Sequence, residues 1–432
     1  MDPYVVMLVL FGTLILLLVA GMRIAFAMLI TGFVGLFFLL DTSQPEMAAK
    51  QLWQFSYTYV LTTIPLFVFM AEILMRCGIT KDGYDNIRGT LGRLRGAESY
   101  TTVLLCTAFA ALSGSSVANA AAIGTVSIPE MRRRGYAESL SLGMVAAGGT
   151  LGILIPPSSA LIIYGSLTGE SVGKLFIAGV IPGILLSASF MLILFLWSIT
   201  RRHDFPASEE GTTLRQKMLS MIALIAPGCL ILLVLGGIYV GIFTPTEAAG
   251  VGAFASVAYV MVKRRLTWSI FKGALEGSIR TTCMIMLIIL GASLITYVLG
   301  FSGATDAIVQ AVVESGVGYW PLMLLIFLFY LVAGCLVEST SLIVLTTPIF
   351  YALMIALHLS PVWFSIFMVI NIEMGLITPP VGLNLFIIQG IAGERSFGTI
   401  VRGVWPFLLA QVLLLLALIA WPQLATWLPG TM

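Results

Sequence analysis

Charged residues are scarce in this chain of 432 residues: 10% are Asp, Glu, Lys or Arg, whereas 59% are hydrophobic. Soluble domains carry about 25% charged residues, so this composition excludes an ordinary soluble globule. At roughly 20 residues per helical crossing, the apolar residues would supply about ten to twelve spans of a lipid bilayer. Little of the chain is left for a soluble domain, and the composition therefore indicates a polytopic membrane protein.

Cysteine and histidine are also rare, with five and two residues respectively. No two cysteines have the CxxC spacing of zinc sites and redox motifs, which excludes both classes. The sequence also lacks a GxxxxGK[ST] phosphate loop, an HExxH zinc helix and a GxSxG nucleophile elbow. A serine hydrolase is disfavoured because neither histidine is close in sequence to the Ser113–Ser116 cluster. We therefore expect a protein that is not an enzyme and has no cofactor.

Long apolar segments predict an all-α polytopic fold. Two segments, about 98–130 and 319–357, are too long for one crossing and are interrupted midway by small polar residues. Irregular backbone at membrane depth is tolerated only where it is buried in protein, so these segments predict re-entrant helical hairpins; pairs of complete short helices are the alternative. Ten further segments predict transmembrane helices: 4–21, 24–40, 52–75, 138–167, 175–200, 218–240, 245–262, 278–299, 361–392 and 403–428.

Basic residues are distributed unevenly among the predicted loops. With both termini outside, 20 of the 22 Lys and Arg residues lie in inside loops, and only Lys50 and Lys174 lie outside. Inside loops of membrane proteins are enriched in Lys and Arg, so we expect both termini on the periplasmic side. The basic runs are interpreted as topology signals, and we expect no binding of nucleic acid.

The sequence contains an internal repeat. Gly152–Pro157 aligns with Gly375–Pro380 at an offset of 223 residues, and each segment contains a Pro-Pro pair. The predicted loop 76–98 carries five basic residues, whereas the aligned stretch 296–318 carries none, which places matching loops on opposite sides of the membrane. This indicates an inverted-topology repeat, which is typical of secondary transporters with a site near the midplane. The predicted halves are 1–217, with its hairpin at about 98–130 and a broken helix at 156–157, and 218–432, with its hairpin at about 319–357 and a broken helix at 379–380.

The hairpin tips and the Pro-Pro breaks are the candidate ion sites, because each leaves backbone groups unpaired at membrane depth. Neutral side-chain oxygens at the first tip and carbonyls of the first break would form an uncharged cage that suits sodium, the only metal expected. Close packing and simple kinks are alternatives for either motif alone, but their duplication favours ion cages. The first cage would comprise Ser113, Ser116, Asn119, Gly152, Ile155 and Pro156, and the second Gly334, Gly375 and Thr378, with Ser339–Ser341 nearby.

The tips also present helix N-termini, whose free N–H groups suit a substrate carboxylate. No arginine falls in the proposed site, so hydroxyls, amides and bound cations would have to recognise the carboxylate. Acidic residues in apolar segments make proton coupling the alternative to sodium coupling, and a channel is a further alternative. The substrate-facing candidates are Ser115, Ser116, Asn119, Ser339, Thr340 and Ser341, and the acidic residues are Glu72, Glu247, Glu338 and Glu373.

Three motifs, Leu112–Asn119, Gly241–Ala249 and Gly375–Gly382, resemble signatures of the large membrane subunit of TRAP transporters, and the resemblance covers essentially the whole chain. It implies an ion-transporter-superfamily fold in which a mobile transport domain moves against a scaffold as an elevator. It also implies sodium-coupled uptake of an organic acid, typically a C4-dicarboxylate, a sialic acid or a related sugar acid. The sodium ligands that the resemblance carries over are Ser113, Ser116, Gly152, Ile155 and Pro156 for one ion, and Gly334, Gly375 and Thr378 for the other.

The resemblance further implies two partners in the bacterial inner membrane and periplasm: a small four-helix membrane subunit and a periplasmic substrate-binding protein. We expect the small subunit to be a separate chain, because nothing before Asp2 suggests a fused one. We also expect the segments 76–98 and 296–318 to be arms that link the mobile domain to the scaffold, with Gly89 and Gly303 among their hinge points.

Overall fold

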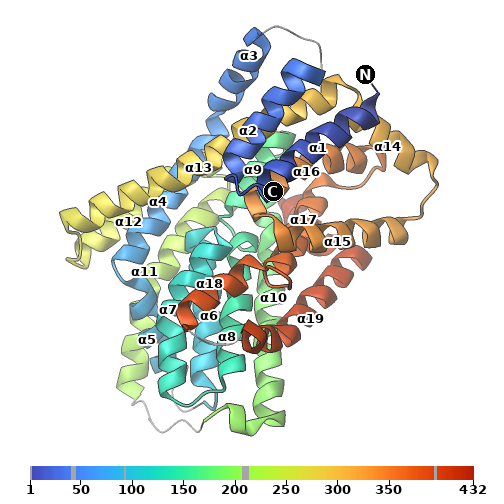
Figure 1. Cartoon of the computed structure of the whole chain (residues 1–432). Helices are drawn as coiled ribbons and strands as arrows, with labels where there is room; N and C mark the ends of the chain where they lie inside the picture. Colours follow the sequence, from blue (N-terminus) through green and yellow to red (C-terminus); the bar gives the residue numbers. More distant parts are fainter. Residues whose placement is uncertain (1, 40–44, 92–93, 207–213, 394–396) are drawn as a thin grey trace.

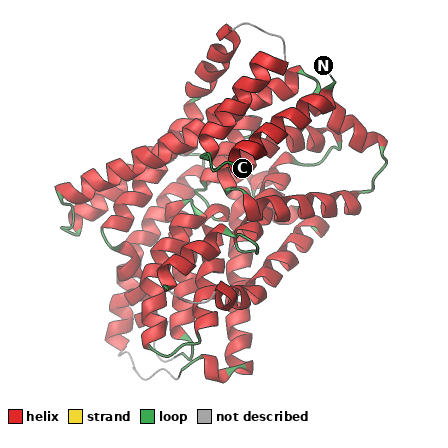
Figure 2. Cartoon of the chain, viewed as in Figure 1, coloured by secondary structure: helices red, strands yellow, loops and turns green. Residues whose placement is uncertain are grey.

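The computed structural model describes residues 2–39, 45–91, 94–206, 214–393 and 397–432. Every regular element within these residues is a helix, and Figure 2 shows no strand among them. Nine helices in this part of the chain are long and apolar enough to cross a membrane. The predicted all-α polytopic class is therefore confirmed.

The first helices agree with the predicted crossings until residue 52. Helix α1 covers Pro3–Val19, and α2 covers Ile24–Val34 and continues as a π-helix over Gly35–Leu39. The single crossing predicted for 52–75 is wrong, since the structure divides it between α3, a 3₁₀ turn and α4. The hydroxyls of Ser56 and Thr58 donate to carbonyls of the preceding turn and so help to end α3. The bounds are Pro45–Ser56 for α3, Tyr59–Thr62 for the turn and Thr63–Arg76 for α4.

The remaining helices occur in the same order in both halves of the chain: a polar helix, a hairpin, an interrupted helix and a long helix (Figure 1). In the first half these are α5 (Ile79–Leu91), α6 (Ala97–Ser113), α7 (Ser116–Arg133), α8 (Glu138–Leu154), α9 (Ser159–Thr168) and α10 (Val172–Thr200). In the second half they are α14 (Ala304–Glu314), α15 (Tyr319–Leu336), α16 (Ser339–Ala356), α17 (Pro361–Leu376), α18 (Leu383–Ala392) and α19 (Phe397–Ala420).

Three other helices complete the second half. Helix α11 covers Leu214–Tyr239, and the predicted division of the chain between residues 217 and 218 falls just inside it. Helix α12 covers Pro245–Val262, which matches its predicted bounds, and Thr244 and Glu247 form a capping box at its start. Helix α13 is longer than predicted and covers Trp268–Phe301, and the short α20 covers Gln423–Thr426 after α19.

Both predicted hairpins are present, and each turns over at a capped helix N-terminus. At the first tip, Gly114 has a φ of 59° and ends α6, and the hydroxyl of Ser115 accepts the N–H of Ala118. At the second tip, Glu338 accepts the N–H of Ser341 with its carboxylate. Ser115 and Glu338 are 223 residues apart, as are Ala118 and Ser341, so the two caps occupy equivalent positions of the repeat.

Both predicted helix breaks are also present, at the cis peptide bonds Pro156–Pro157 and Pro379–Pro380. Each break is tied to its own hairpin by a backbone hydrogen bond of 3.3 Å. Ser159 donates its N–H to the Gly114 carbonyl, and Gly382 donates its N–H to the Cys335 carbonyl. This correspondence supports the predicted repeat, whose inverted membrane topology remains a prediction.

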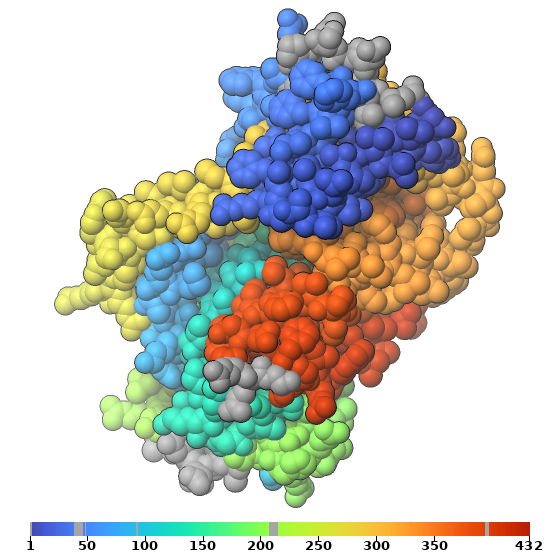
Figure 3. Space-filling model, in the orientation of Figure 1, coloured from blue at the N-terminus to red at the C-terminus, as the bar shows by residue number. Residues whose placement is uncertain are grey.

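The halves interlock, because each interrupted helix packs against the hairpin of the other half. Helix α18 packs against α7, and α9 packs against α16. In Figure 3 the surface of α18 borders that of the first hairpin although the two are far apart in sequence. Helices α8 and α19 approach most closely at two glycines: a Cβ on Gly143 would lie 2.1 Å from the Gly403 carbonyl carbon. A close-packed central bundle thus holds both tips and both breaks.

A buried ionic cluster ties helix α5 to the base of the first hairpin. Glu98 accepts from Arg88 Nε at 2.8 Å and from the Tyr136 hydroxyl, and Arg134 Nε lies 3.3 Å from it. Burial by itself raises the pKa of Glu98, but the hydrogen bonds from Tyr136 and Arg88 outweigh burial and hold this pKa below its usual range. The predicted arm is therefore attached to the hairpin through a carboxylate that stays ionised.

The basic loop residues gather away from the N-terminus. The C-terminal ends of α7 and α10 lie at the lower edge of Figure 1, whereas the N-terminus lies at the upper edge. Arg93 and Arg395, which the topology prediction counts as inside residues, lie outside the described residues.

Candidate functional site

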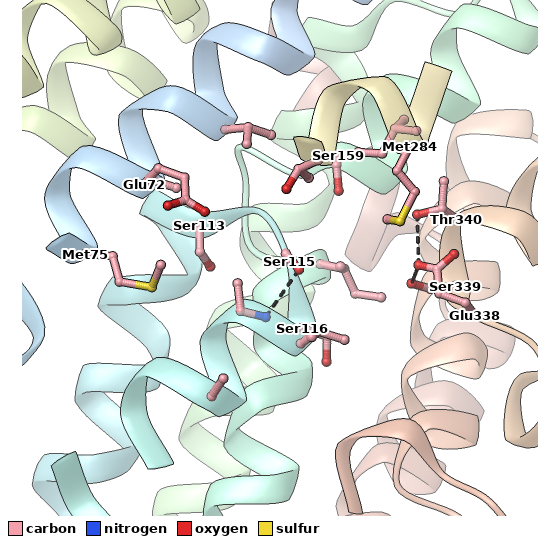
Figure 4. A pocket seen from close by; sticks show the side chains of 18 of the residues that line it. Glu72, Met75, Ser113, Ser115, Ser116, Ser159, Met284, Glu338, Ser339 and Thr340 are labelled. Atoms are coloured by element: carbon pink, nitrogen blue, oxygen red, sulfur yellow. Dashed lines mark hydrogen bonds between the residues drawn. The ribbon is translucent and has the colours of Figure 1, made fainter. Parts of the chain in front are cut away.

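A cavity of about 390 Å³ lies between the two hairpin tips. In Figure 4, Ser113, Ser115 and Ser116 of the first hairpin face Glu338, Ser339 and Thr340 of the second across it. Five of the predicted site residues line this cavity, and the others lie behind its wall. The polar lining residues are Glu72, Ser113, Ser115, Ser116, Ser159, Thr281, Glu338, Ser339 and Thr340.

The first tip contributes three serines from the end of α6 and the start of α7. The Ser113 hydroxyl is buried and has no hydrogen-bond partner. The Ser115 hydroxyl caps α7, and the Ser116 hydroxyl accepts an N–H from Asn384 of α18 at 2.8 Å. Ser113 therefore offers an oxygen with no competing partner, whereas Ser115 and Ser116 are already oriented by the protein.

Asn119 lies one turn behind the tip, fully buried between α6, α7 and α8. Its Nδ2 group donates to the Cys106 carbonyl at 3.1 Å and lies 3.3 Å from the carbonyls of Gly148 and Gly149. Its Oδ1 atom is buried without a partner. A buried amide oxygen left unpaired costs about 1–3 kcal/mol, so this atom favours a ligand such as a cation or a water molecule.

The first break lies directly beside this tip. A Cβ on Gly152 would lie 2.5 Å from the Ser115 carbonyl oxygen and 3.0 Å from Cβ of Asn119, so the two segments are in backbone contact. Ile155 has an extended backbone after the end of α8, and Pro156 follows it. Because proline has no N–H, the carbonyls before the break lack their usual helical partners. The structure therefore brings together all members of the first predicted cage.

The second tip differs from the first because its helix N-terminus is filled by the chain's own carboxylate. Glu338 accepts from the hydroxyls of Ser339 at 3.1 Å and Thr340 at 2.9 Å, and from the backbone and the hydroxyl of Ser341. Ser341 is fully buried and does not reach the cavity. An incoming carboxylate would have to compete with Glu338 for these donors.

The second predicted cage is equally close-packed but is separated from the cavity. A Cβ on Gly375 would lie 2.4 Å from the carbonyl carbon of Gly334, so α15 and α17 touch at these glycines. The Thr378 hydroxyl donates to the Met374 carbonyl at 2.6 Å, which leaves its lone pairs for another ligand. These three residues surround one point of backbone contact, as the prediction requires.

A third wall of the cavity comes from α4 and α13. Glu72 of α4 lines it and accepts from Arg76 Nε at 2.9 Å. Two glycines of α13 make room for this ion pair: a Cβ on Gly277 would lie 2.6 Å from the Glu72 carboxyl carbon, and one on Gly273 would lie 2.6 Å from Arg76 Nη1. No Lys, Arg or His of the described chain lines the cavity.

The other acidic candidates lie elsewhere. Glu373 of α17 is fully buried two residues before Gly375, and neither of its carboxyl oxygens has a hydrogen-bond partner among the described residues. Glu247 caps α12 at an exposed position.

Asn384 is the main residue that sequence reasoning missed. It is fully buried, and it donates to Ser116 and to the Ala146 carbonyl at 3.2 Å. The available signal was an asparagine within an apolar helix, four residues after a Pro-Pro pair. Glu72 was noted as an acidic residue, but its position on the cavity wall depends on tertiary packing.

Two facing hairpins, two interrupted helices and a polar cavity between them are the architecture of a secondary membrane transporter. A solved structure, the Alcanivorax borkumensis YdaH transporter, has a similar fold, with a TM-score of 0.62 at 14% identity over 89% of this chain and 88% of that chain. Residues 11–424 match the family described as "Tripartite ATP-independent periplasmic transporter, DctM component". The chain belongs to this family.

Curated relatives carry the similarity over nearly the full length. The C4-dicarboxylate TRAP transporter large permease protein of Pseudomonas aeruginosa is 36% identical over 393 residues, which cover 91% of each chain. The 2,3-diketo-L-gulonate TRAP transporter large permease protein of Escherichia coli is 31% identical over 423 residues, covering 96% of this chain and 97% of that protein. The relatives are named as permeases, so this chain is a transporter subunit rather than an enzyme.

Proposed function

We propose that this chain is the large permease subunit through which an organic acid enters the cell together with sodium ions. The relatives named above transport a C4-dicarboxylate and a diketo sugar acid, and both substrates are organic acids. A sialic acid or another sugar acid belongs to the same chemical class. The substrate would occupy the cavity between the two hairpin tips.

The charge of the cavity wall is the observation that carries sodium coupling. The lining contains two carboxyl groups, Glu72 and Glu338, and no basic side chain among the described residues. Two like unit charges about 6 Å apart repel by roughly 3 kcal/mol at an effective dielectric constant of about 20. An organic anion therefore needs accompanying cations to enter. The unpaired buried oxygens of Ser113 and Asn119 beside the first break suit a hard monovalent cation.

Alternating access would follow from motion of the two hairpins and two interrupted helices against the remaining helices. The interlocking of α18 with α7 and of α9 with α16 supports their moving as one body. The polar helices α5 and α14 would serve as the arms. In this elevator, Glu72 and Thr281 form the stationary wall, and the serine-rich tips carry the substrate.

The complete transporter would contain a small four-helix membrane subunit and a periplasmic substrate-binding protein, as in the family. We place it in the bacterial inner membrane with both termini periplasmic, because the basic loops gather at the opposite end of the molecule from the N-terminus. Selectivity would then be set largely by the binding protein.

Uptake into proteoliposomes tests the proposal. The chain, its small subunit and its binding protein are combined, and a sodium gradient or a proton gradient is imposed with radiolabelled C4-dicarboxylates, 2,3-diketo-L-gulonate and sialic acid as probes. Uptake of at least one probe that requires sodium, and that falls in Ser113→Ala and in Thr378→Ala, is the expected result. Uptake driven by protons alone and insensitive to both substitutions would overturn sodium coupling.

Matched controls are available for both variants. The Ser127 hydroxyl of α7 is buried without a partner, like that of Ser113, but does not line the cavity. The Thr200 hydroxyl bonds to the carbonyl four residues earlier, like that of Thr378, but lies at the far end of α10. Ser127→Ala and Thr200→Ala should keep the wild-type sodium dependence.

A further inference from the structure

Asn384 connects the second half of the chain to the substrate-facing tip of the first. It is the second residue of α18, is fully buried, and lies 268 residues from its partner Ser116. Its Nδ2 group donates to Ser116 Oγ at 2.8 Å and to the Ala146 carbonyl at 3.2 Å. One amide group thus joins α18 to α7 and to α8.

The orientation of the Asn384 amide is fixed by chemistry. A backbone carbonyl only accepts hydrogen bonds, so the atom that faces Ala146 must be the nitrogen. Ser116 Oγ therefore accepts from Asn384 and retains its own proton for donation. Because Ser116 lines the cavity, this proton is available to an anionic group there. A donor that itself accepts a hydrogen bond is strengthened by the polarisation of the chain.

The same end of α18 is attached to the second tip. Gly382, two residues before Asn384, donates its N–H to the Cys335 carbonyl of the second hairpin at 3.3 Å. The segment that carries Asn384 begins directly after the break Pro379–Pro380. A displacement at the second break is therefore passed to the Ser116 hydroxyl through three residues of chain and one hydrogen bond.

The first half has no counterpart of this contact. The residue 223 positions before Asn384 is Leu161, which is fully buried and has no polar side-chain atom. The asymmetry shows that the amide at position 384 is not required by the repeated architecture, since the equivalent position of α9 is filled by an apolar side chain. Its Oδ1 atom is nevertheless buried without a partner, which is a cost that packing alone does not repay.

We propose that Asn384 is a positioning residue for substrate recognition: it orients the Ser116 hydroxyl as a donor into the cavity and links that donor to the second helix break. The inference rests on the proposed function, because it assigns the substrate's anionic group to Ser116. It names a specific path by which the second predicted ion cage affects recognition at the first tip.

The test compares uptake kinetics of Asn384→Ala, Asn384→Asp, Ser116→Ala and the double variant Asn384→Ala/Ser116→Ala in the complete reconstituted transporter. The probe is whichever of the three radiolabelled acids the wild type accumulates. Loss of one oriented donor to an anion should raise KM by about 10- to 100-fold and leave the maximal rate within about twofold. Asn384→Asp should resemble Asn384→Ala, because a carboxylate accepts the Ser116 proton instead of leaving it for the substrate.

Two comparisons separate positioning from a merely structural role. If Asn384 acts through Ser116, its substitution adds nothing in the Ser116→Ala background. Gln411→Ala is the matched control: Gln411 is fully buried, donates to the Thr150 hydroxyl at 2.9 Å and has an unpaired Oε1 atom, but is absent from the cavity lining. It should lower thermal stability as much as Asn384→Ala does and leave KM unchanged.

A readout without substrate keeps the inference testable if no probe is transported. Backbone hydrogen exchange of the complete complex should increase at the first tip, residues 113–119, in Asn384→Ala and stay at the wild-type level in Gln411→Ala. Unchanged exchange at the tip, an unchanged KM, or fully additive effects with Ser116→Ala would overturn the inference. Wild-type uptake that needs no sodium would instead overturn the proposed function and leave the Asn384 comparisons interpretable.

Discussion

Replacing Gly152 with alanine should weaken sodium binding at the first tip without abolishing folding. A Cβ at this position would lie 2.5 Å from the Ser115 carbonyl oxygen and 2.8 Å from the carbonyl carbon. Ordinary contacts begin near 3.4 Å, so α8 and the tip would have to separate by about 0.9 Å. Both obstructing atoms belong to the backbone, which cannot rotate away as a flexible side chain would. The separation therefore opens the predicted cage.

The expected magnitude follows from the cost of overpacking, which is typically about 1–3 kcal/mol. If this cost falls on the ion-bound state, the apparent sodium affinity drops by roughly 5- to 150-fold, since about 1.4 kcal/mol corresponds to a factor of ten. The assays are the sodium dependence of thermal unfolding in detergent and the sodium concentration for half-maximal uptake.

A second glycine serves as the control for the intrinsic effect of a methyl group. Gly250 of α12 has no atom within 4 Å of its ideal Cβ position. Gly250→Ala should leave the sodium dependence unchanged and raise helix stability by at most about 1 kcal/mol. If Gly152→Ala retains the sodium dependence of the wild type, the first cage does not lie where the tip meets the break.

Three further predictions concern other parts of the molecule. Gly375→Ala should weaken the second ion site in the same way, because its Cβ would lie 2.4 Å from the Gly334 carbonyl carbon; an unchanged sodium stoichiometry and affinity would contradict this. Glu72→Gln should lower KM for a dicarboxylate by about 3- to 10-fold, because it removes a like charge from the wall, and a rise in KM would mean that Glu72 binds substrate or cation. Glu98→Gln should destabilise the protein by about 3 kcal/mol at neutral pH, because it leaves Arg88 and Arg134 without that carboxylate, as thermal unfolding would show. The lowered pKa of Glu98 contributes stability that is present above the unfolded value of about 4.3 and is lost as the pH falls through the folded value; the stability of Glu98→Gln should therefore be less sensitive to acid in that range, and an equal sensitivity would refute the assignment.

The hairpins and the breaks could be predicted because each conflicts with its surroundings. Small polar residues at 113–116 and paired prolines at 156–157 are unfavourable in lipid, so their presence in apolar segments indicates a buried, irregular backbone. Duplication at an offset of 223 residues then identified the second set. The division of 52–75 was missed because side-chain hydroxyls ended α3 inside a run that is otherwise apolar.

The polar contacts of the site could not be predicted, because they depend on which distant segments meet. Asn384 and Ser116 are 268 residues apart, and no local pattern pairs them. The sequence likewise predicted an open helix N-terminus at the second tip. Spacing alone does not reveal that the Glu338 side chain folds back onto Ser339, Thr340 and Ser341. The position of Glu72 on the cavity wall required the packing of α4 against glycines of α13.

The central claim is that sodium ions bound beside the hairpin tips accompany an organic acid through the cavity. Sodium-driven accumulation of a radiolabelled acid in proteoliposomes that contain all three proteins tests it most directly, with Ser113→Ala compared against Ser127→Ala. We predict that accumulation requires an inward sodium gradient, falls in Ser113→Ala and is unchanged in Ser127→Ala. Accumulation that persists without sodium under a proton gradient, at equal rates in both variants, would contradict the account.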